Sequence, residues 1–202
     1  MDRRLIRIKS FALTYHLFLL FLAFLLIGLY NLDDYGISWD EEAQREIGLH
    51  NYNYIFNGSE SLKTFYAKDY GPSFELPLFI IEKLFHVEEP RTMYLLRHFL
   101  SHLFFLIGAF FCSKLVNQLY KNKFLSTISF LLVVMCPRLY EDSFVNTKDI
   151  PFMSMFFVCF YLIYSAFTKM KPLNFFYLGV SIGLLISLRI MGVLLFSSVL
   201  VF

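Results

Sequence analysis

The stretch that decides the fold is "FALTYHLFLLFLAFLLIGLY", residues 11–30, which contains no Asp, Glu, Lys or Arg. An apolar run of about 20 residues is long enough to cross a bilayer as a helix. It exceeds the apolar core of a typical signal peptide, and the "NLDD" that follows offers no small-residue cleavage site. We therefore expect residues 11–30 to be a retained first membrane span.

The remaining composition extends this interpretation to the whole chain. Of the 202 residues 57% are hydrophobic, and 26 are Phe and 13 are Tyr, which is more apolar surface than a soluble core of this size can bury. The sequence predicts an all-α, polytopic membrane protein forming one domain over residues 1–202. Five or six spans are expected, at about 11–30, 92–113, 124–137, 150–168, 173–188 and 190–202. Because the chain stops inside the apolar run "LLFSSVLVF", we expect it to be truncated at its C-terminus.

Charged residues alternate in sign between successive connections. Twelve of the 16 acidic residues lie within 31–91 and three within 138–149. Basic residues instead occupy the N-terminal tail and two short connectors, as Arg3, Arg4, Arg7, Lys9, Lys114, Lys121, Lys123, Lys169 and Lys171. Lys and Arg are retained on the cytoplasmic side, so the N-terminus should be cytoplasmic and the two acidic segments should be outside. A bacterial inner membrane is the expected location.

The first outer loop, residues 31–91, is too long to be a simple connector. Ser38 and Glu41 have the spacing of a capping box and predict a helix start. A second segment, "PSFELPLFIIEKLF" at 72–85, has apolar residues at helical spacing, with Glu75 and Glu82 on another face. We expect both segments to be helices lying on the membrane surface.

Three adjacent carboxylates stand in the loop stretch "GISWDEEAQREIGL", residues 36–49. Acids in a first helical turn complement the helix dipole, which is one explanation for all three. However, they follow Trp39, a residue typical of the membrane interface, where partial desolvation would make a carboxylate a better base. We favour function for Asp40, leave capping and function open for Glu41, and favour a solvated role for Glu42.

The second acidic connection, "CPRLYEDSFVNTKDIPF" at 136–152, is predicted to be an outer loop between two spans. Arg138 and Lys148 are its only basic residues, and Asn146 and Asp149 lie beside Lys148. A loop that mixes acids and bases at a membrane face suits a phosphate-bearing ligand with a polar reaction partner. The alternative is a polar loop with Asp149 at a helix start.

Span two carries Arg97, with His98 and His102 one turn apart. Ionisable groups inside a membrane favour a functional role, so Arg97 is a candidate phosphate-binding residue, although it lies close enough to the outer surface to snorkel. For the histidines we favour internal hydrogen bonding, because no third metal ligand has a matching spacing. Arg189 is interpreted as a buried or cytoplasm-edge arginine. Cys112, Cys136 and Cys159 are interpreted as small buried apolar residues.

Two motifs in this order resemble those of the C-type glycosyltransferases, in the branch of protein O-mannosyltransferases and aminoarabinose transferases. They are Trp39-Asp40-Glu41 in the first outer loop, and Pro137-Arg138 with the run 146–152 in the second. The resemblance covers the first five spans. One departure is Tyr70-Gly71-Pro72, where many relatives have His-Pro-Pro, so the acceptor is open. The family fold has about twice as many spans, so the half that completes the lipid-phosphate site would be missing.

The resemblance implies inverting transfer of a sugar from a polyprenyl-phosphate donor to a hydroxyl group on a protein or glycolipid acceptor. Asp40 would be the general base, Asp149 and Glu41 would orient the acceptor or a divalent cation, and Arg138 and Lys148 would stabilise the leaving phosphate. Asn146 and Arg97 are further binding candidates. The sequence has no metal-ligand set, phosphate loop or nucleic-acid pattern. We therefore expect no nucleic-acid partner, and membrane lipids are the other expected partners. The alternatives are a transporter or flippase component and an inactive truncated scaffold.

Overall fold

The structure, a computed structural model, describes the backbone of residues 3–201 and the side chains of residues 15–198, and every regular element within that range is helical. The side chains of the N-terminal basic residues therefore lie outside the described part. The elements in chain order are α1 (Arg3–Tyr30), η1 (Leu32–Asp34), α2 (Glu41–Asn57), α3 (Ser61–Thr64), α4 (Glu75–Leu84), α5 (Pro90–Tyr120), α6 (Lys123–Val134), α7 (Pro137–Val145), α8 (Asp149–Lys169), α9 (Pro172–Leu188), η2 (Ile190–Gly192) and α10 (Val193–Val201).

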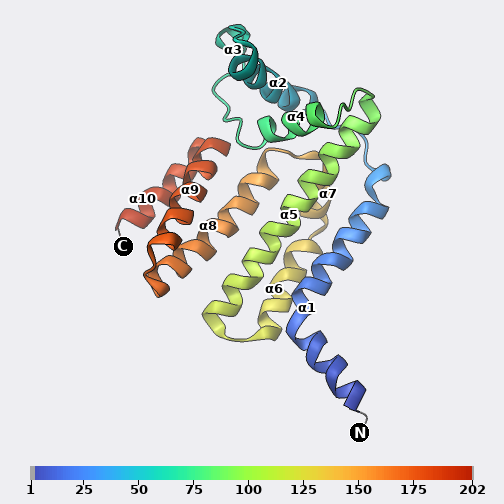
Figure 1. Cartoon of the computed structure of the whole chain (residues 1–202), viewed down its shortest axis with the longest axis vertical. Helices are drawn as coiled ribbons and strands as arrows, with labels where there is room; N and C mark the ends of the chain where they lie inside the picture. Colours follow the sequence, from blue (N-terminus) through green and yellow to red (C-terminus); the bar gives the residue numbers. More distant parts are fainter. Residues whose placement is uncertain (1–2, 202) are drawn as a thin grey trace.

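The long helix α5 is the centre of the bundle and contacts α1, α6, α7 and α8 (Figure 1). Gly108 lets α5 approach α8 closely, because a Cβ atom at Gly108 would lie only 2.6 Å from the Cα of Ser154. On the α6 side, the hydroxyl groups of Ser113 and Ser126 each donate to the other residue's carbonyl, at 2.6 and 2.9 Å. Small residues and hydroxyl pairs of this kind are typical of helix packing within membranes.

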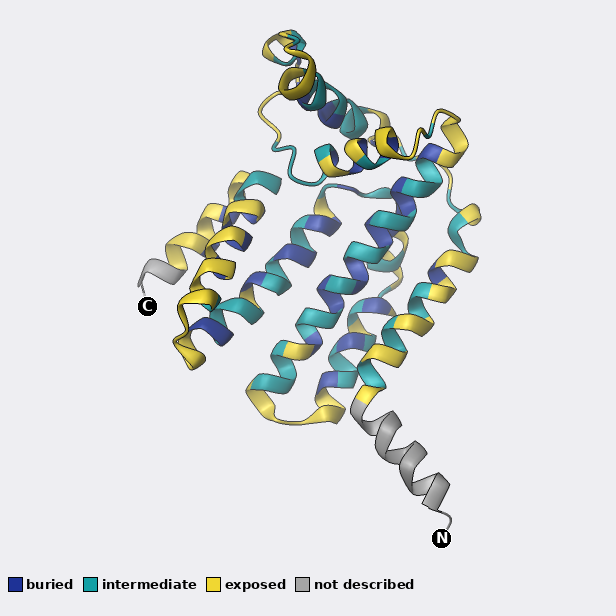
Figure 2. Ribbon diagram, in the orientation of Figure 1, coloured by how far each residue is buried: buried dark blue, intermediate teal, exposed yellow. Residues whose placement is uncertain are grey.

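By length and composition, the described helices support fewer spans than the five or six that the sequence predicts. Within the described residues, only α5 and α8 are long and apolar enough to cross a membrane, and α6 with α7 would add a third if that bent pair is one span. The described apolar part of α1, Tyr15–Tyr30, and α9 are shorter apolar helices. Figure 2 shows α5 buried along much of its length, whereas α1 and α9 expose many apolar residues, as surfaces facing lipid do.

The segment predicted to be the second outer loop is instead largely a helix. Pro137 starts α7, which is bent by 61° from α6 and packs against α5. Its inner face is apolar: Phe144 is fully buried and lies parallel between Tyr35 and the His102 ring, with centroid separations of 4.2 and 4.4 Å. The loop prediction was wrong because Pro137 begins a new helix, and because Tyr140 and Phe144, one turn apart on that helix, both pack against His102.

Helices α2, α3 and α4 form a layer across one end of the bundle, and the basic connectors α5–α6 and α8–α9 lie at the other end (Figure 1). Both helices expected in residues 31–91 are therefore present, as α2 and α4. Trp39 is 98% exposed on this layer. The face of α4 with Glu75 and Glu82 turns inward, because both carboxylates are buried against Arg97 of α5. The end of the molecule that carries the α2–α4 layer is thus acidic, and the opposite end, which carries the two basic connectors, is basic.

Candidate functional site

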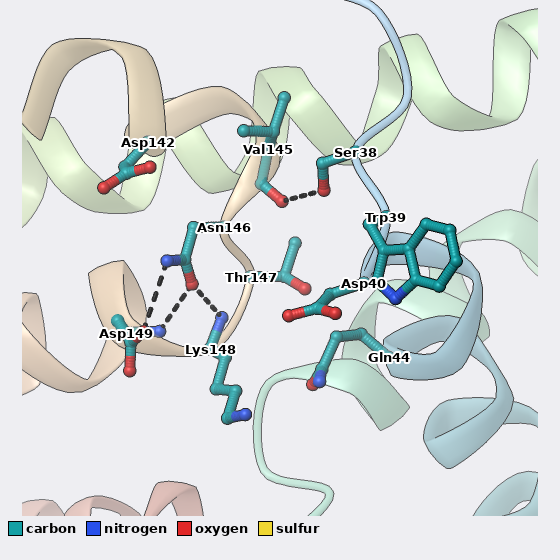
Figure 3. Close-up of a pocket in the computed structure, with 10 residues that line it drawn as sticks. All are labelled: Ser38, Trp39, Asp40, Gln44, Asp142, Val145, Asn146, Thr147, Lys148 and Asp149. Carbon is teal, nitrogen blue, oxygen red and sulfur yellow. Dashed lines mark hydrogen bonds between the residues drawn. The ribbon is translucent and has the colours of Figure 1, made fainter. Parts of the chain in front are cut away.

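Two sequence-distant segments form a cleft of about 390 Å³ where the α2–α4 layer meets the α7–α8 connection. We call it the Asp40 cleft. Residues 38–40 and Gln44 line one wall, and Asp142 with residues 145–149 lines the other. In Figure 3 the Asp40 carboxylate points toward the 146–148 segment, whereas the Trp39 ring points away from it. Of the predicted site residues, the structure brings Asp40, Asn146, Lys148 and Asp149 together here.

Asp40 immediately precedes α2 and is exposed at the cleft, so the desolvated carboxylate that its position suggested is not seen. The turn before it is fixed by its neighbour. The backbone N–H of Ser38 donates to Glu41 Oε2 at 2.6 Å, which is one half of the predicted capping box. The other half is absent, because the Ser38 hydroxyl donates to the carbonyl of Val145 on the opposite wall, at 3.4 Å.

Glu41 does not line the Asp40 cleft. Its side chain is fully buried, and its Oε1 lies 2.7 Å from Nε2 of His98 on α5. A buried carboxylate requires partners of this kind, since an unpaired charge away from water is costly. Glu41 therefore anchors the start of α2 to α5 and holds the turn that presents Asp40.

The other wall of the cleft is a tight turn organised by Asn146. Its Oδ1 accepts hydrogen bonds from the backbone N–H groups of Lys148, at 3.2 Å, and Asp149, at 2.8 Å, and its Nδ2 donates to Asp149 Oδ2 at 3.3 Å. These bonds satisfy N–H groups at the start of α8 that have no partner within the helix. Asp149 also forms an ion pair of 2.5 Å with Arg189.

A second cleft of about 640 Å³ adjoins the first and shares Lys148 with it. We call it the Arg189 cleft. Residues 69–71 line one side and residues 186–191 line the other, so its surface is mostly apolar, with two cations and the carboxylate of Asp69. Lys148 Nζ lies 5.0 Å from the centre of the Tyr70 ring. Gly71 is required at this point, because a Cβ there would lie 1.4 Å from the carbonyl oxygen of Ser187.

Arg189 was not predicted as a site residue but as a buried or cytoplasm-edge arginine, and it is instead partly exposed in the Arg189 cleft. It follows α9 and meets the first residue of α8, at the same end of the bundle as the α2–α4 layer. The alternation of spans contained this signal, since a helix that begins at the connector 169–171 must end on the opposite side.

Arg97 is fully buried and does not line either cleft, so it is not placed to bind a substrate phosphate. It pairs with Glu75 and, at 2.8 Å, with Glu82 of α4. Arg45 of α2 pairs with the same Glu82 at 3.0 Å, and the hydroxyl of Thr147 donates to Glu75. This buried polar layer, Arg45–Glu82–Arg97–Glu75–Thr147, ties α2, α4 and α5 to the segment that carries Asn146, Lys148 and Asp149.

Arg138 does not line the clefts either. Its side chain is 75% exposed and pairs with Asp142 one turn later on α7, at 2.9 Å. Asp142, which lines the Asp40 cleft, and Gln44 are the polar residues there that sequence reasoning missed. No local signal marked them, because both belong to helices whose orientation depends on tertiary packing.

The two histidines of α5 make the internal contacts expected of them: His98 meets Glu41, and His102 Nδ1 lies 2.8 Å from the Ser143 hydroxyl. Within the described residues, no group of three or more His, Cys, Asp or Glu side chains is arranged to hold a metal ion. The cysteines are free thiols; Cys159 is buried, and Cys112 and Cys136 are partly buried. We compared the chain with protein-family models, curated protein sequences and solved structures, and none of them matches it.

Proposed function

We propose that the chain is the catalytic portion of a polyprenyl-phosphate-dependent glycosyltransferase, which transfers a sugar to an acceptor hydroxyl at the membrane surface. One observation carries this proposal: Asp40 shares a cleft with Lys148 and Asp149, and Lys148 also lines the adjoining Arg189 cleft. The Asp40 cleft is open and offers a carboxylate, and the adjoining Arg189 cleft is largely apolar and offers two cations. Together the two clefts match the three chemical needs of this reaction. These are a base, a phosphate site and a lipid-accessible surface.

Each group has a defined part in the transfer. Asp40 takes the proton of the acceptor hydroxyl as its oxygen bonds to the anomeric carbon. The bond between that carbon and the phosphate oxygen breaks, and the electron pair leaves with the polyprenyl phosphate. Lys148 and Arg189 stabilise the charge on this leaving group, a role that the sequence assigned to Arg138 and Lys148. Asp149 holds Arg189 in place and, with Asn146, fixes the loop.

The proposed arrangement in the membrane has five or six spans, with the N-terminus in the cytoplasm and the α2–α4 layer outside, in a bacterial inner membrane. The separation of the acidic layer from the basic connectors supports this orientation. In it, both clefts lie at the outer membrane face, where a lipid-linked donor can enter from the bilayer. An acceptor protein or glycolipid would approach the Asp40 cleft from outside.

The test uses the full chain in lipid nanodiscs with radiolabelled hexosyl and pentosyl polyprenyl phosphates. Donor binding is measured first, and transfer to simple hydroxyl acceptors second. We expect Asp40→Asn to retain donor binding and to slow transfer by about 100-fold or more, as loss of a general base does. Lys148→Met should weaken donor binding.

Glu42→Gln is the matched control, because Glu42 is an exposed acid in the same helical turn that does not line the cleft. It should bind donor and transfer sugar like the unmodified chain. Transfer at an unchanged rate in Asp40→Asn, or the absence of donor binding by the unmodified chain, would contradict the proposal.

One observation favours a second candidate, a transporter or flippase component. The break of 61° between α6 and α7 is a discontinuity of the kind found at transporter binding sites. Proteoliposomes loaded with a fluorescent lipid-linked sugar distinguish the two functions. Movement of intact lipid between leaflets without transfer indicates a flippase, and neither activity indicates an inactive scaffold.

A further inference from the structure

A third cleft lies on the other side of the segment that carries Trp39 and Asp40. It has a volume of about 480 Å³ and is bounded by residues 33–37 and by the first two turns of α5. We call it the His98 cleft. It shares no lining residue with the Asp40 cleft or the Arg189 cleft. The proposed transfer reaction uses none of its residues.

The most unusual group in this cleft is the imidazole of His98. Its side chain is only 1% exposed, and its Nδ1 has no hydrogen-bond partner. Nε2 is occupied, because it lies 2.7 Å from Glu41 Oε1. With Nε2 donating its proton to the carboxylate, the neutral tautomer carries its lone pair on Nδ1. A buried acceptor without a partner is costly, and a ligand hydroxyl would satisfy it.

The walls around His98 are aromatic and held in place. Tyr35 and Tyr94 both line the cleft. The Tyr35 ring stacks on the buried Phe144 at 4.2 Å and 14°, and Phe144 stacks in turn on His102 at 4.4 Å and 5°. Tyr35 is therefore positioned before any ligand arrives, which lowers the entropic cost of binding.

The rim of the cleft carries one charge of each sign. Arg91 and Asp33 form an exposed pair at 3.5 Å, with 71% and 67% of their side chains accessible. A phosphate would be attracted by Arg91 but repelled by Asp33 and by the buried Glu41 behind His98. A metal ion would find a single imidazole. An uncharged ligand with many hydroxyl groups matches this set, because each hydroxyl can donate to Nδ1 or to Asp33 and accept from Arg91.

We propose that the His98 cleft binds an uncharged sugar, with Nδ1 of His98 accepting a hydrogen bond from one of its hydroxyl groups. This site is separate from the transfer site, since the two clefts share no lining residue. It binds sugar whether or not Asp40 catalyses transfer. Aromatic walls, a charged rim and a buried acceptor on a rigid floor together favour a pyranose ring over a flexible chain.

The experiment measures saturation-transfer NMR signals from methyl glucoside, methyl galactoside and methyl mannoside, added to the full chain in nanodiscs. We expect at least one of these sugars to bind. His98→Gln should weaken binding at least tenfold, because the Gln amide can still donate to Glu41 but its carbonyl oxygen lies one bond further from the backbone than Nδ1. Asp33→Asn and Arg91→Gln, both exposed and tolerant of substitution, should weaken the same sugar's binding.

Arg138→Gln is the control, since the Arg138 side chain is 75% exposed and lines none of the three clefts. It should leave sugar binding unchanged, as should Asp40→Asn, which separates this site from the transfer reaction. Absence of a signal from all three sugars overturns the proposal. So does binding that His98→Gln, Asp33→Asn and Arg91→Gln all leave unaltered.

Discussion

Asp40 and Glu41 are adjacent in the chain, yet Asp40 lies exposed in an open cleft and Glu41 is fully buried against α5. The same contrast separates the basic residues. Lys148 and Arg189 line clefts, whereas Arg97 has no exposed surface and pairs with two glutamates. The end of the molecule that carries the α2–α4 layer thus has two polar regions of similar composition: a buried polar layer and an open pair of clefts.

The difference teaches that charge gathered at one end of a helical bundle does not itself indicate a binding site. In the buried polar layer nearly every charge is compensated by another side chain, so no charge is left for a ligand, and the arrangement fixes geometry instead. In the clefts the ion pairs are partly exposed, with the Asp149 and Arg189 side chains 52% and 34% accessible. The buried polar layer also holds the clefts in position. Thr147 belongs to the layer through its hydrogen bond to Glu75, and the next residue, Lys148, lines both the Asp40 cleft and the Arg189 cleft.

The largest expected effect comes from breaking the buried layer. Arg97→Met leaves Glu75 and Glu82 with uncompensated charge, and we expect a loss of about 3–5 kcal/mol in the free energy of unfolding. Chemical denaturation in detergent, followed by fluorescence, measures it. Arg138→Met is the control, since its exposed pair should contribute less than about 1 kcal/mol. Equal losses in the two variants would remove the distinction between the regions.

The next effect concerns the close packing that holds α8 beside α5. Gly108→Ala places a Cβ 2.6 Å from the Ser154 backbone, so we expect about 1–3 kcal/mol of destabilisation from overpacking. Gly179→Ala on α9 is the matched control, because a Cβ there meets no atom within 4 Å. Thermal unfolding of both variants provides the test. A Gly108→Ala protein as stable as the Gly179→Ala protein would show that the approach of α5 and α8 is looser than described.

The adjacent acids provide a direct comparison of the two regions. Glu41→Gln weakens a buried, charge-assisted contact with His98 and should cost about 1–3 kcal/mol of stability. Asp40→Asn changes an exposed group and should alter stability by less than about 0.5 kcal/mol. Denaturation curves of the two variants, collected side by side, measure the difference. The interpretation fails if Asp40→Asn proves the more destabilising of the two.

The smallest effect is expected at Glu89, at the exposed start of α5. A hydrogen bond from the Thr92 side chain, with others from backbone N–H groups, holds the pKa of Glu89 below its usual 4.5. Because this pKa is lowered on folding, the stabilisation is present above about pH 4.5 and is lost as the pH falls through the folded-state pKa. Glu89→Ala should remove that part of the pH dependence. Unfolding measured at about pH 3–6, roughly the range in which glutamate titrates, tests this expectation.

The features of the fold and site that the sequence predicted are those that local sequence patterns determine. For residues 146–149 the structure confirms the alternative interpretation, a polar segment with Asp149 at a helix start, because Asn146 and Asp149 interact over three residues. Residues 137–145 were predicted to be a loop, and they form α7 instead. Local sequence does not indicate this helix, because Phe144 packs against Tyr35 and His102, which are distant in the chain. The partners of Arg97 and Arg189, which are Glu75 and Asp149, were not predicted for a related reason: they lie 22 and 40 positions away, and no local spacing indicates the pairing.

The sequence by itself determined the apolar helices, the separation of acidic from basic connections, and the helices within residues 31–91. Each of these follows from hydrophobicity, charge or spacing within about 20 residues. Only the tertiary structure decided which charges are buried and which are free. A carboxylate is compensated or available according to whether a distant side chain reaches it, as His98 reaches Glu41 and none fully covers Asp40.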